Sequence, residues 1–242
     1  MSFFSLINLP NLLTLLNLFA GCMAVVFTFN YRLEWVPACV LVSLIADFLD
    51  GFAARFTKNS TEIGKQLDSL ADMVSFGVVP GVVLFELLFQ LYESDGSSFS
   101  LKRIYLYSSA AFFIPLFASL RLAKFNLDTR QTDSFIGLAT PAVTIFVTGI
   151  LLLKLFPYEM VSGIIISKPA IYIYIALLSL LMVAELPMFS FKFKNFAWQG
   201  NEMRYLFIIL SAVLLLTLKF AAVSLIIILY ILISLAQKLL RP

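Results

Sequence analysis

The sequence predicts an all-α integral membrane protein, a bundle of about eight transmembrane helices forming a single membrane domain over residues 1–242. Of these residues 61% are hydrophobic, and the mean hydropathy is +0.98, well above the usual range of a soluble domain. Apolar stretches long enough to cross roughly 30 Å of hydrocarbon recur from end to end. No soluble domain therefore has room to build a core of its own.

The first three spans are defined by where charges stand. Because the first basic residue is Arg32, the charged region of a secretory signal is missing, and the first span is expected to be retained. From Trp35 to Ala46 runs only about 18 Å of helix, so the second span reaches full length by including Asp47 to Ala54. In the third, a full-length apolar run follows Asp72. The eight expected spans are 12–29, 35–55, 70–92, 104–121, 137–154, 169–190, 205–218 and 220–237.

The last two of these spans depend on a single break. As one helix, 205–237 would be about 50 Å long, which exceeds the bilayer. Only Lys219 interrupts it, and no Gly or Pro marks a turn. We expect two spans here.

The basic residues favour an orientation with the N-terminus inside. In that orientation most of the seventeen Lys and Arg residues lie in cytoplasmic segments, as the positive-inside rule requires. The polar loop 92–103, YESDGSSFSLKR, then falls outside, and the acidic stretch 46–77 faces the cytoplasm. The expected location is a prokaryotic cytoplasmic membrane.

Cysteine and histidine usage excludes several kinds of site. Cys22 and Cys39 lie in apolar stretches, so two buried free thiols are expected rather than a disulfide. The chain has no histidine. Phosphohistidine intermediates, His-ligated zinc and Ser-His or Cys-His nucleophile pairs within this chain are therefore excluded.

Four aspartates stand in the otherwise apolar stretch ADFLDGFAARFTKNSTEIGKQLDSLADMVSFG. Asp47 and Asp50 are three residues apart, and Asp68 and Asp72 are four apart, so each pair shares one face of a helix. The short link FTKNSTEI forces the two helices to run antiparallel as neighbours. The four carboxylates are expected to converge.

Such a cluster requires cations. An ionised Asp at the centre of a membrane helix costs about 2.5 to 3.5 kcal/mol on insertion scales, and mutual repulsion adds to that cost. Hard oxygen ligands without His or Cys select Mg²⁺, Mn²⁺ or Ca²⁺, and four carboxylates can hold two such ions. Gly51, Ala54 and Gly64 leave the facing surfaces bare. Arg55 suits a phosphate beside the metals.

The residues alone leave other interpretations open. Intramembrane carboxylates also mark ion pathways and proton relays, so a divalent-cation or proton-coupled transporter is one alternative. A purely structural role for the small-residue faces is another.

The order of these residues narrows the choice. The pattern Asp47-x-x-Asp50-Gly51-x-x-Ala54-Arg55, eight residues, Gly64-x-x-x-Asp68-x-x-x-Asp72 resembles the signature of the CDP-alcohol phosphotransferases, and all eight positions match. The resemblance implies a six-helix family core. It also implies a membrane enzyme that moves a phosphatidyl or similar group from a CDP-linked donor to an alcohol, releasing CMP.

Flanking segments are most similar to the phosphatidylserine-forming branch of that family: LPNLLTLLNLFAGCMAV, SFGVVPG, RLAKFN and FIGLATPAV. This implies CDP-diacylglycerol and L-serine as substrates, with glycerol 3-phosphate or inositol as alternative acceptors. Three positions depart from the branch. Lys124 stands where arginine is usual, Ala139 where proline is usual, and Glu185 is an unexpected buried acid in the sixth span.

The resemblance also implies roles for the signature residues. Asp47, Asp50 and Asp68 are expected as the principal ligands of two Mg²⁺ or Mn²⁺ ions, with Ca²⁺ a further option. Asp72 is expected as the base that takes the serine proton, with a contact to metal as well. Gly51, Ala54, Arg55 and Gly64 are expected to line the pocket for CDP.

Serine needs a partner for its carboxylate. Arg121 and Lys124 are the candidates by charge and depth, although both are also typical flanking charges of a span. The resemblance alone adds Asn126, Thr140 and Pro141. Membrane lipids are expected partners, nucleic acid is not, and the family suggests a homodimer.

Overall fold

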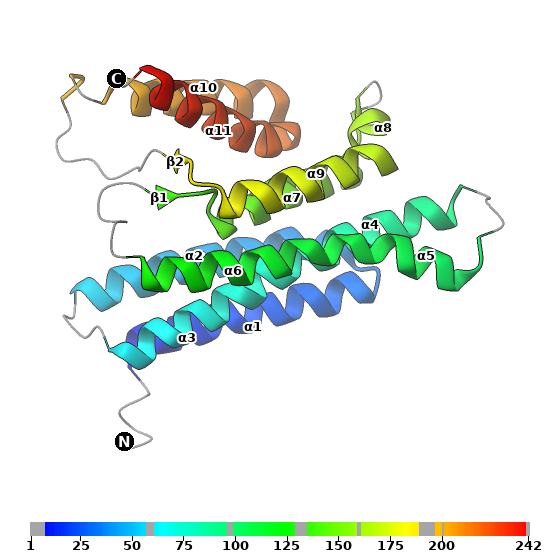
Figure 1. The fold of residues 1–242 in the computed structure, drawn as a ribbon, viewed down its shortest axis with the longest axis horizontal. Coiled ribbons are helices and arrows are strands. Elements are labelled where there is room, and N and C mark those ends of the chain that lie inside the picture. The colour runs from blue at the N-terminus through cyan, green and yellow to red at the C-terminus, as the bar shows by residue number, and fades with distance from the viewer. Residues whose placement is uncertain are drawn as a thin grey trace.

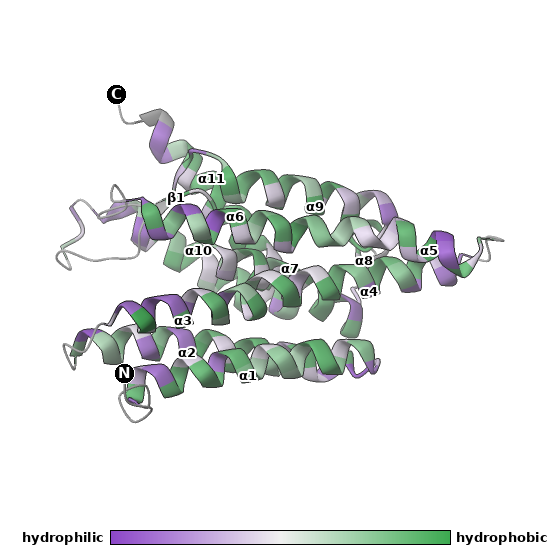
Figure 2. Cartoon of the chain, turned by 60° about the horizontal axis from the view of Figure 1, so that its bottom comes forward, coloured by the Kyte–Doolittle hydropathy of each residue, from purple (hydrophilic) through white to green (hydrophobic). Residues whose placement is uncertain are grey.

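The computed structural model describes residues 8–56, 61–95, 99–128, 135–158, 161–188, 197–199 and 201–240. The helices run up and down in one bundle (Figure 1). Two shorter apolar helices accompany five helical runs that are long and apolar enough to cross a membrane, which are Leu9–Phe29, Leu33–Phe56, Glu62–Glu93, Leu101–Leu127 and Glu202–Lys238. Hydrophobic residues occupy the middle of the bundle, and hydrophilic ones gather toward its ends (Figure 2). The all-α membrane fold is confirmed.

The first two helices form an antiparallel pair. Asn8 caps α1 (Leu9–Phe29) by accepting a hydrogen bond from the Asn11 amide, and a proline stands in the first turn. Tyr31, with φ of 56°, reverses the chain. A short 3₁₀ turn, η2 (Leu33–Trp35), then leads into α2 (Val36–Phe56).

The third helical run is longer than expected. It consists of α3 (Glu62–Asp72), the π-helical turn η3 (Met73–Val78) and α4 (Val79–Glu93). Thr61 caps it, accepting from the Gly64 amide at 3.0 Å, so the run begins before the expected span 70–92. Both Asp68 and Asp72 therefore lie on a regular helix.

The π-helical turn has a physical cause in Pro80. Proline has no N–H, so it cannot donate to the carbonyl of Phe76 one turn earlier. That carbonyl accepts instead from the Thr144 hydroxyl of α7 at 3.1 Å. The widened turn is thus satisfied by a neighbouring helix, as a membrane interior requires.

The helix α4 lies at the centre of the bundle. In the run Glu62–Glu93, to which α4 belongs, 78% of the most apolar 18-residue stretch is buried. The corresponding share is 33% in α1 and 17% in Glu202–Lys238. The outer helices are therefore left with broad apolar faces, which suit a lipid environment.

The fourth to sixth passes surround α4. The fourth comprises α5 (Leu101–Ser108), the 3₁₀ turn η4 (Ser109–Phe112) and α6 (Phe113–Leu127). The fifth and sixth are α7 (Thr140–Leu155) and α9 (Lys168–Val183), joined through the single turn α8 (Ser162–Ile165).

Two very short strands tie the links around α7 and α9 together. β1 (Phe135–Ile136) pairs antiparallel with β2 (Pro187–Met188). Gly137 follows with φ of 77°, and a Cβ there would lie 2.5 Å from the Met182 carbonyl oxygen. Only glycine fits this approach to the end of α9.

The last two spans are confirmed as a hairpin. Lys219, at φ 49° and ψ −119°, ends α10 (Glu202–Leu218). A 3₁₀ turn, η5 (Lys219–Ala221), then leads into α11 (Ala222–Leu240), which lies beside α10 (Figure 1).

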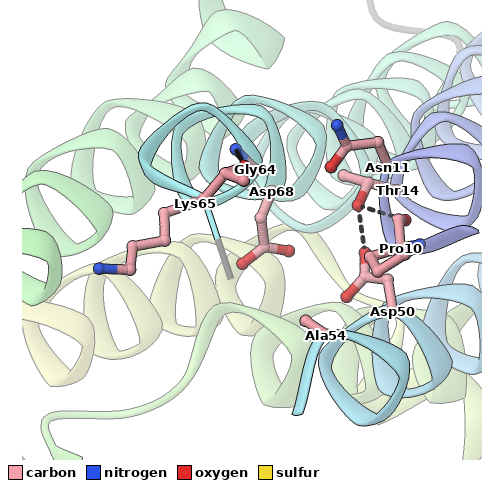
Figure 3. A pocket seen from close by; sticks show the side chains of 9 residues that line it. Pro10, Asn11, Thr14, Asp50, Ala54, Gly64, Lys65 and Asp68 are labelled. Atoms are coloured by element: carbon pink, nitrogen blue, oxygen red, sulfur yellow. Dashed lines mark hydrogen bonds between the residues drawn. The ribbon is translucent and has the colours of Figure 1, made fainter. Parts of the chain in front are cut away.

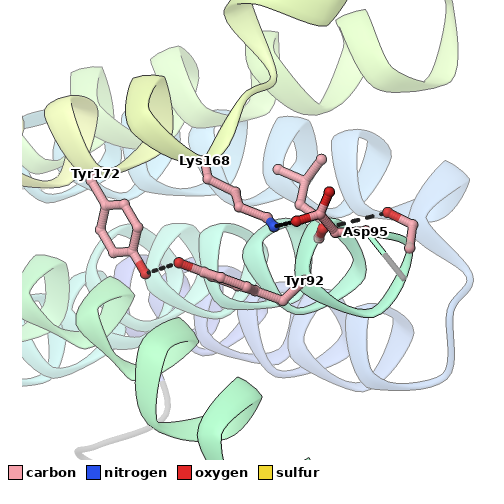
Figure 4. Close-up of polar contacts among 6 residues, drawn as sticks. Tyr92, Asp95, Lys168 and Tyr172 are labelled. Atoms are coloured by element: carbon pink, nitrogen blue, oxygen red, sulfur yellow. Dashed lines mark hydrogen bonds and ion pairs between the residues drawn. The ribbon is translucent and has the colours of Figure 1, made fainter. Parts of the chain in front are cut away.

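Polar contacts join α4, α5 and α9 at the end of the bundle opposite the described chain ends (Figure 1), and those around Tyr92 and Lys168 are drawn in Figure 4. The Tyr92 and Tyr172 hydroxyls lie 3.0 Å apart, and Tyr172 also donates to the Tyr107 carbonyl at 3.1 Å. Lys168 pairs with Asp95 at 2.5 Å and lies over the Tyr92 ring. This cluster, the distal polar cluster, holds three helices together.

Two expectations from the sequence need correction. The sixth span was expected to reach residue 190 with Glu185 buried, but α9 ends at Val183 and the Glu185 side chain is 70% exposed. Cys22 and Cys39 are both free, as expected, but Cys22 is exposed on α1 rather than buried. It stands on the outer face of that helix, where lipid rather than protein covers it.

Candidate active site

Three of the four aspartates converge. Asp47 and Asp50 on α2 and Asp68 on α3 each offer a carboxylate oxygen, and these oxygens all lie within 4.8 Å of one another. Asp50 is almost fully buried at 5% exposure. Spacings of three and four residues put the side chains on facing sides of two neighbouring helices, as expected.

A small pocket of about 80 Å³ opens between Asp50, Asp68 and the start of α1 (Figure 3). Of the residues expected to bind the donor, Ala54 and Gly64 line this pocket, whereas Gly51 and Arg55 are not among its lining residues. Its lining residues come from α1, α2 and the start of α3, and they are Pro10, Asn11, Thr14, Asp50, Ala54, Thr61, Gly64, Lys65 and Asp68.

The donor set fits a divalent cation. In the described ranges none of the four aspartates has an ion pair with Lys or Arg. Lys65, on the pocket wall, pairs with Glu62 instead. Asp68 Oδ1 is buried without a hydrogen-bond partner in the described residues. Buried carboxylates without cationic partners are costly, and oxygen donors alone suit Mg²⁺, Mn²⁺ or Ca²⁺.

The helix α1 supplies contacts that sequence reasoning missed. The Thr14 hydroxyl donates to Asp50 Oδ2 at 2.6 Å, as Figure 3 shows. The Asn17 amide donates to Asp72 Oδ1 at 3.2 Å. A usable signal existed, because Asn11, Thr14 and Asn17 repeat every three residues and stand on one face of an otherwise apolar span.

Asp72 lies one turn beyond Asp68. Two of the predicted serine-binding residues, Arg121 and Thr140, lie at a similar level of the bundle. Arg121 is 7% exposed on α6, and α6 packs against η3, the turn that follows Asp72. Thr140 is fully buried one turn before Thr144, which bonds to Phe76, itself one turn beyond Asp72. In the described part of the chain, Arg121 Nε and Thr140 Oγ1 are buried without hydrogen-bond partners.

The other two predicted serine-binding residues make contacts elsewhere. Lys124 pairs with Glu185 at 3.2 Å, on an exposed surface beyond the end of α9. Asn126 donates to the Ser69 hydroxyl at 2.9 Å, on the side of α3 between the two aspartates. Both side chains therefore have protein partners of their own.

The predicted donor-binding residues Gly51 and Arg55 lie at the open end of α2. Nothing stands within 4 Å of where a Gly51 Cβ would be. Arg55 is exposed, and its Nε donates to the Gly51 carbonyl at 2.9 Å. The guanidinium is thus held near the end of α2, beside Ala54 but outside the lining of the pocket.

Comparison with known proteins gives a consistent result. Residues 7–184 match the family model described as CDP-alcohol phosphatidyltransferase. All four aspartates lie inside that range, and the α10–α11 hairpin lies outside it. The chain is 37% identical over 187 residues to a protein of Helicobacter pylori named CDP-diacylglycerol--serine O-phosphatidyltransferase, covering 76% of this chain and 72% of that protein.

Two further relatives are more distant. A Mycobacterium leprae protein of the same name is 30% identical, with 74% of this chain and 57% of that protein covered. A protein of Methanothermobacter thermautotrophicus named archaetidylserine synthase is 28% identical, with 75% and 70% covered.

Proposed function

Because the chain belongs to the CDP-alcohol phosphatidyltransferase family, we propose that it transfers a phosphatidyl group from CDP-diacylglycerol to the hydroxyl of L-serine and releases CMP. The names of its relatives support serine as the acceptor. Among the structural observations, the one that carries most weight is the convergence of Asp47, Asp50 and Asp68, none of which forms an ion pair with Lys or Arg in the described ranges.

Divalent cations complete this site in the proposal. Asp47, Asp50 and Asp68 would hold two Mg²⁺ or Mn²⁺ ions, with Ca²⁺ a further option, and Asp72 borders them. When bound, such ions neutralise charge on the diphosphate of the donor as CMP departs.

In this proposal Asp72 accepts the proton in the transfer step. The serine Oγ–H bond breaks and its proton passes to Asp72, a bond forms between Oγ and the lipid-bearing phosphorus, and the bond from that phosphorus to the CMP oxygen breaks. A carboxylate is a weak base at neutral pH, so positioning contributes much of the acceleration.

Two further sets of residues would bind the donor headgroup and the acceptor. The bare surface at Gly51 and Ala54, with Gly64 opposite, leaves room for the nucleotide, and Arg55 at the mouth suits its phosphates. Arg121 would pair with the serine carboxylate, and the Thr140 hydroxyl lies in the same layer. The partners of Lys124 and Asn126 make them weaker candidates, outside this pocket.

An apolar cavity supports a lipid donor. It has a volume of about 340 Å³ and lies among α2, α7, the turn of the last hairpin and the start of α11. On α2 it reaches Leu44, about one turn from Asp47. We expect it to take an acyl chain of the donor, since apolar walls at membrane depth favour one. Its lining residues are Pro37, Ala38, Val40, Leu41, Leu44, Ile145, Thr148, Leu152, Phe220 and Val223.

The proposed setting is a prokaryotic cytoplasmic membrane with the site facing the cytoplasm. The described chain ends, the end of α2 and the start of α3 share one end of the bundle (Figure 1). The positive-inside rule, applied to the sequence, favours that end as the cytoplasmic one. Bacterial and archaeal relatives support this setting. The whole chain, residues 1–242, acts as one domain in this proposal, and a homodimer is the expected assembly.

The choice of acceptor is tested directly. Purified protein with CDP-diacylglycerol and Mn²⁺ is offered serine, glycerol 3-phosphate, inositol or ethanolamine, and CMP release is measured for each. We expect serine to be preferred, because one carboxylate matches the single buried Arg121, whereas a phosphate acceptor needs a cluster of basic residues. A faster reaction with glycerol 3-phosphate or inositol contradicts serine, and no CMP release with any acceptor favours transport.

The same assay tests Arg121. Arg121→Ala should raise the serine KM by an amount worth about 1.5 to 3 kcal/mol, the loss expected for a charged hydrogen bond. The KM for CDP-diacylglycerol should stay nearly unchanged. Lys124→Ala is the matched control, because Lys124 pairs with Glu185, and it should leave the serine KM within about twofold of wild type.

A further inference from the structure

Asn17 of α1 is the only described residue that donates a hydrogen bond to the Asp72 carboxylate. The Asn17 side chain is fully buried, and its Nδ2 lies 3.2 Å from Asp72 Oδ1. Asn17 lies outside the Asp47–Asp72 signature and more than fifty residues from Asp72 in sequence. The contact therefore comes from a different helix from those that carry the aspartates.

The backbone around Asn17 is fixed by three helical segments. Its carbonyl accepts from the Ser43 hydroxyl of α2 at 3.1 Å and from the Ser75 hydroxyl of η3 at 2.9 Å. One turn further, Gly21 allows α1 to touch Ser75, since an added Cβ would lie 3.0 Å from the Ser75 Cα. The Asn17 amide is thus presented to Asp72 from a rigid position.

Packing alone does not account for this side chain. Within the described residues, Asn17 Oδ1 is buried without a hydrogen-bond partner. A buried amide with an unpaired oxygen makes the folded protein less stable than an apolar side chain of the same size would. At most neighbouring positions α1 has leucine. The donor group facing Asp72 is the part of Asn17 that leucine cannot replace.

We propose that Asn17 is a positioning residue, whose amide holds Asp72 Oδ1 and fixes the orientation of the carboxylate that accepts the serine proton. The proposal rests on the proposed function. The proton leaves the serine Oγ for Asp72 as the Oγ–phosphorus bond forms and CMP departs with the broken phosphorus–oxygen bond. A carboxylate free to rotate would meet the hydroxyl in fewer productive orientations.

The test replaces Asn17 with Leu, which keeps the volume, and with Gln, which keeps an amide donor. Thr28→Val is the matched control: Thr28 is also a fully buried polar residue of α1, but its hydroxyl bonds only to the Ala24 carbonyl near the far end. For each variant, kcat, both KM values, the thermal unfolding midpoint and calorimetric binding of CDP-diacylglycerol with Mn²⁺ are measured.

We expect Asn17→Leu to lower kcat by about 10- to 100-fold, as is usual when an orienting hydrogen bond is lost. Donor affinity, both KM values and the unfolding midpoint should match the Thr28→Val control, and Asn17→Gln should recover part of kcat. If Asn17→Leu does not fold, Asn17→Ala is compared with Asn17→Gln by the same measurements.

Three results overturn the proposal. They are a wild-type kcat in Asn17→Leu, a loss of donor affinity that accounts for the loss of activity, and equal activity of the Leu and Gln variants. A wild-type protein that releases no CMP with serine overturns the proposed function itself, and this proposal with it. If the wild type is active and the replacement of Asn17 does not change kcat, only this proposal is overturned.

Discussion

Asp68 has one carboxylate oxygen, Oδ1, that is buried and has no hydrogen-bond partner in the described ranges. The Asp50 carboxylate, by contrast, accepts from Thr14 at 2.6 Å. Both carboxylates lie in one cluster with Asp47. Asp68 therefore has a buried oxygen that a bound cation could satisfy, whereas the Asp50 carboxylate already has a protein donor.

The metal-binding role of these carboxylates is directly testable. Asp47→Asn and Asp68→Asn should each reduce kcat/KM by more than about a hundredfold, because each removes an anionic ligand while keeping the side-chain volume. CMP release is followed while Mn²⁺ or Mg²⁺ is titrated. Glu62→Gln is the control, because that carboxylate pairs with Lys65 at an exposed position. Wild-type activity that survives thorough chelation with EDTA would contradict a two-metal site.

At this scale the sequence predicted the convergence of three of the four aspartates, and it did not predict their hydrogen-bond partners. Spacing put each pair of aspartates on one helical face, and the short link made the two helices neighbours. All four were expected to converge, but Asp72 is not in the cluster that Asp47, Asp50 and Asp68 form. The partners Thr14 and Asn17 depend on which helix packs against which, and on rotation about each axis. Neither can be derived from one span by itself.

Helix lengths were predicted less well than helix number. Hydropathy located eight passes, but capping decided the ends: Thr61 starts α3 well before the apolar run. The end of α9 at Val183 left Glu185 outside the helix, where it pairs with Lys124. Hydropathy locates the apolar segments that fit the hydrocarbon core, whereas capping residues and strand pairing determine at which residue a helix ends.

Close contacts between helices give a prediction at the level of elements. A Cβ at Gly21 would collide with Ser75 of η3, and a Cβ at Gly149 would collide with the Ser224 backbone of α11. Gly21→Ala and Gly149→Ala should each destabilise the protein by about 1 to 3 kcal/mol, the usual cost of overpacking.

Only one of these two variants should affect the chemistry. Gly21→Ala moves α1, and with it the Asn17 contact to Asp72, so activity per folded molecule should fall. Gly149→Ala moves α11, away from the aspartates, so kcat per folded molecule should hold. The KM for CDP-diacylglycerol should rise, because Val223 beside Gly149 lines the apolar cavity. Thermal unfolding with CMP release per folded protein measures both effects. Equal loss of activity in the two variants would show that the hairpin and the site are mechanically joined.

The whole molecule has two ends with different polar contacts. The aspartate site lies toward the end that holds both described chain ends, and the distal polar cluster lies at the other (Figures 1 and 4). Rigid helices span the distance between them, and no described polar contact links the two. Stability and catalysis should therefore respond separately to changes at the distal end.

Tyr172→Phe tests this separation. It removes a hydroxyl that contacts both Tyr92 and the Tyr107 carbonyl, so the free energy of unfolding should fall by about 1 kcal/mol. The kcat and both KM values should not change. Tyr158→Phe, at a 48% exposed tyrosine, is the control and should leave the unfolding midpoint unchanged. A change in kcat with Tyr172→Phe would argue against independent ends.

The contacts that α1 makes with the aspartates also bear on how the chain is made. The ribosome synthesises α1 first, so Thr14 and Asn17 are already available when α2 and α3 leave the translocon. Each aspartate that entered lipid alone would cost about 2.5 to 3.5 kcal/mol. Hydroxyl and amide donors on the preceding helix offset part of that cost for Asp50 and Asp72 during biogenesis. The order of synthesis thus delivers the hydrogen-bond donors before the charges that need them.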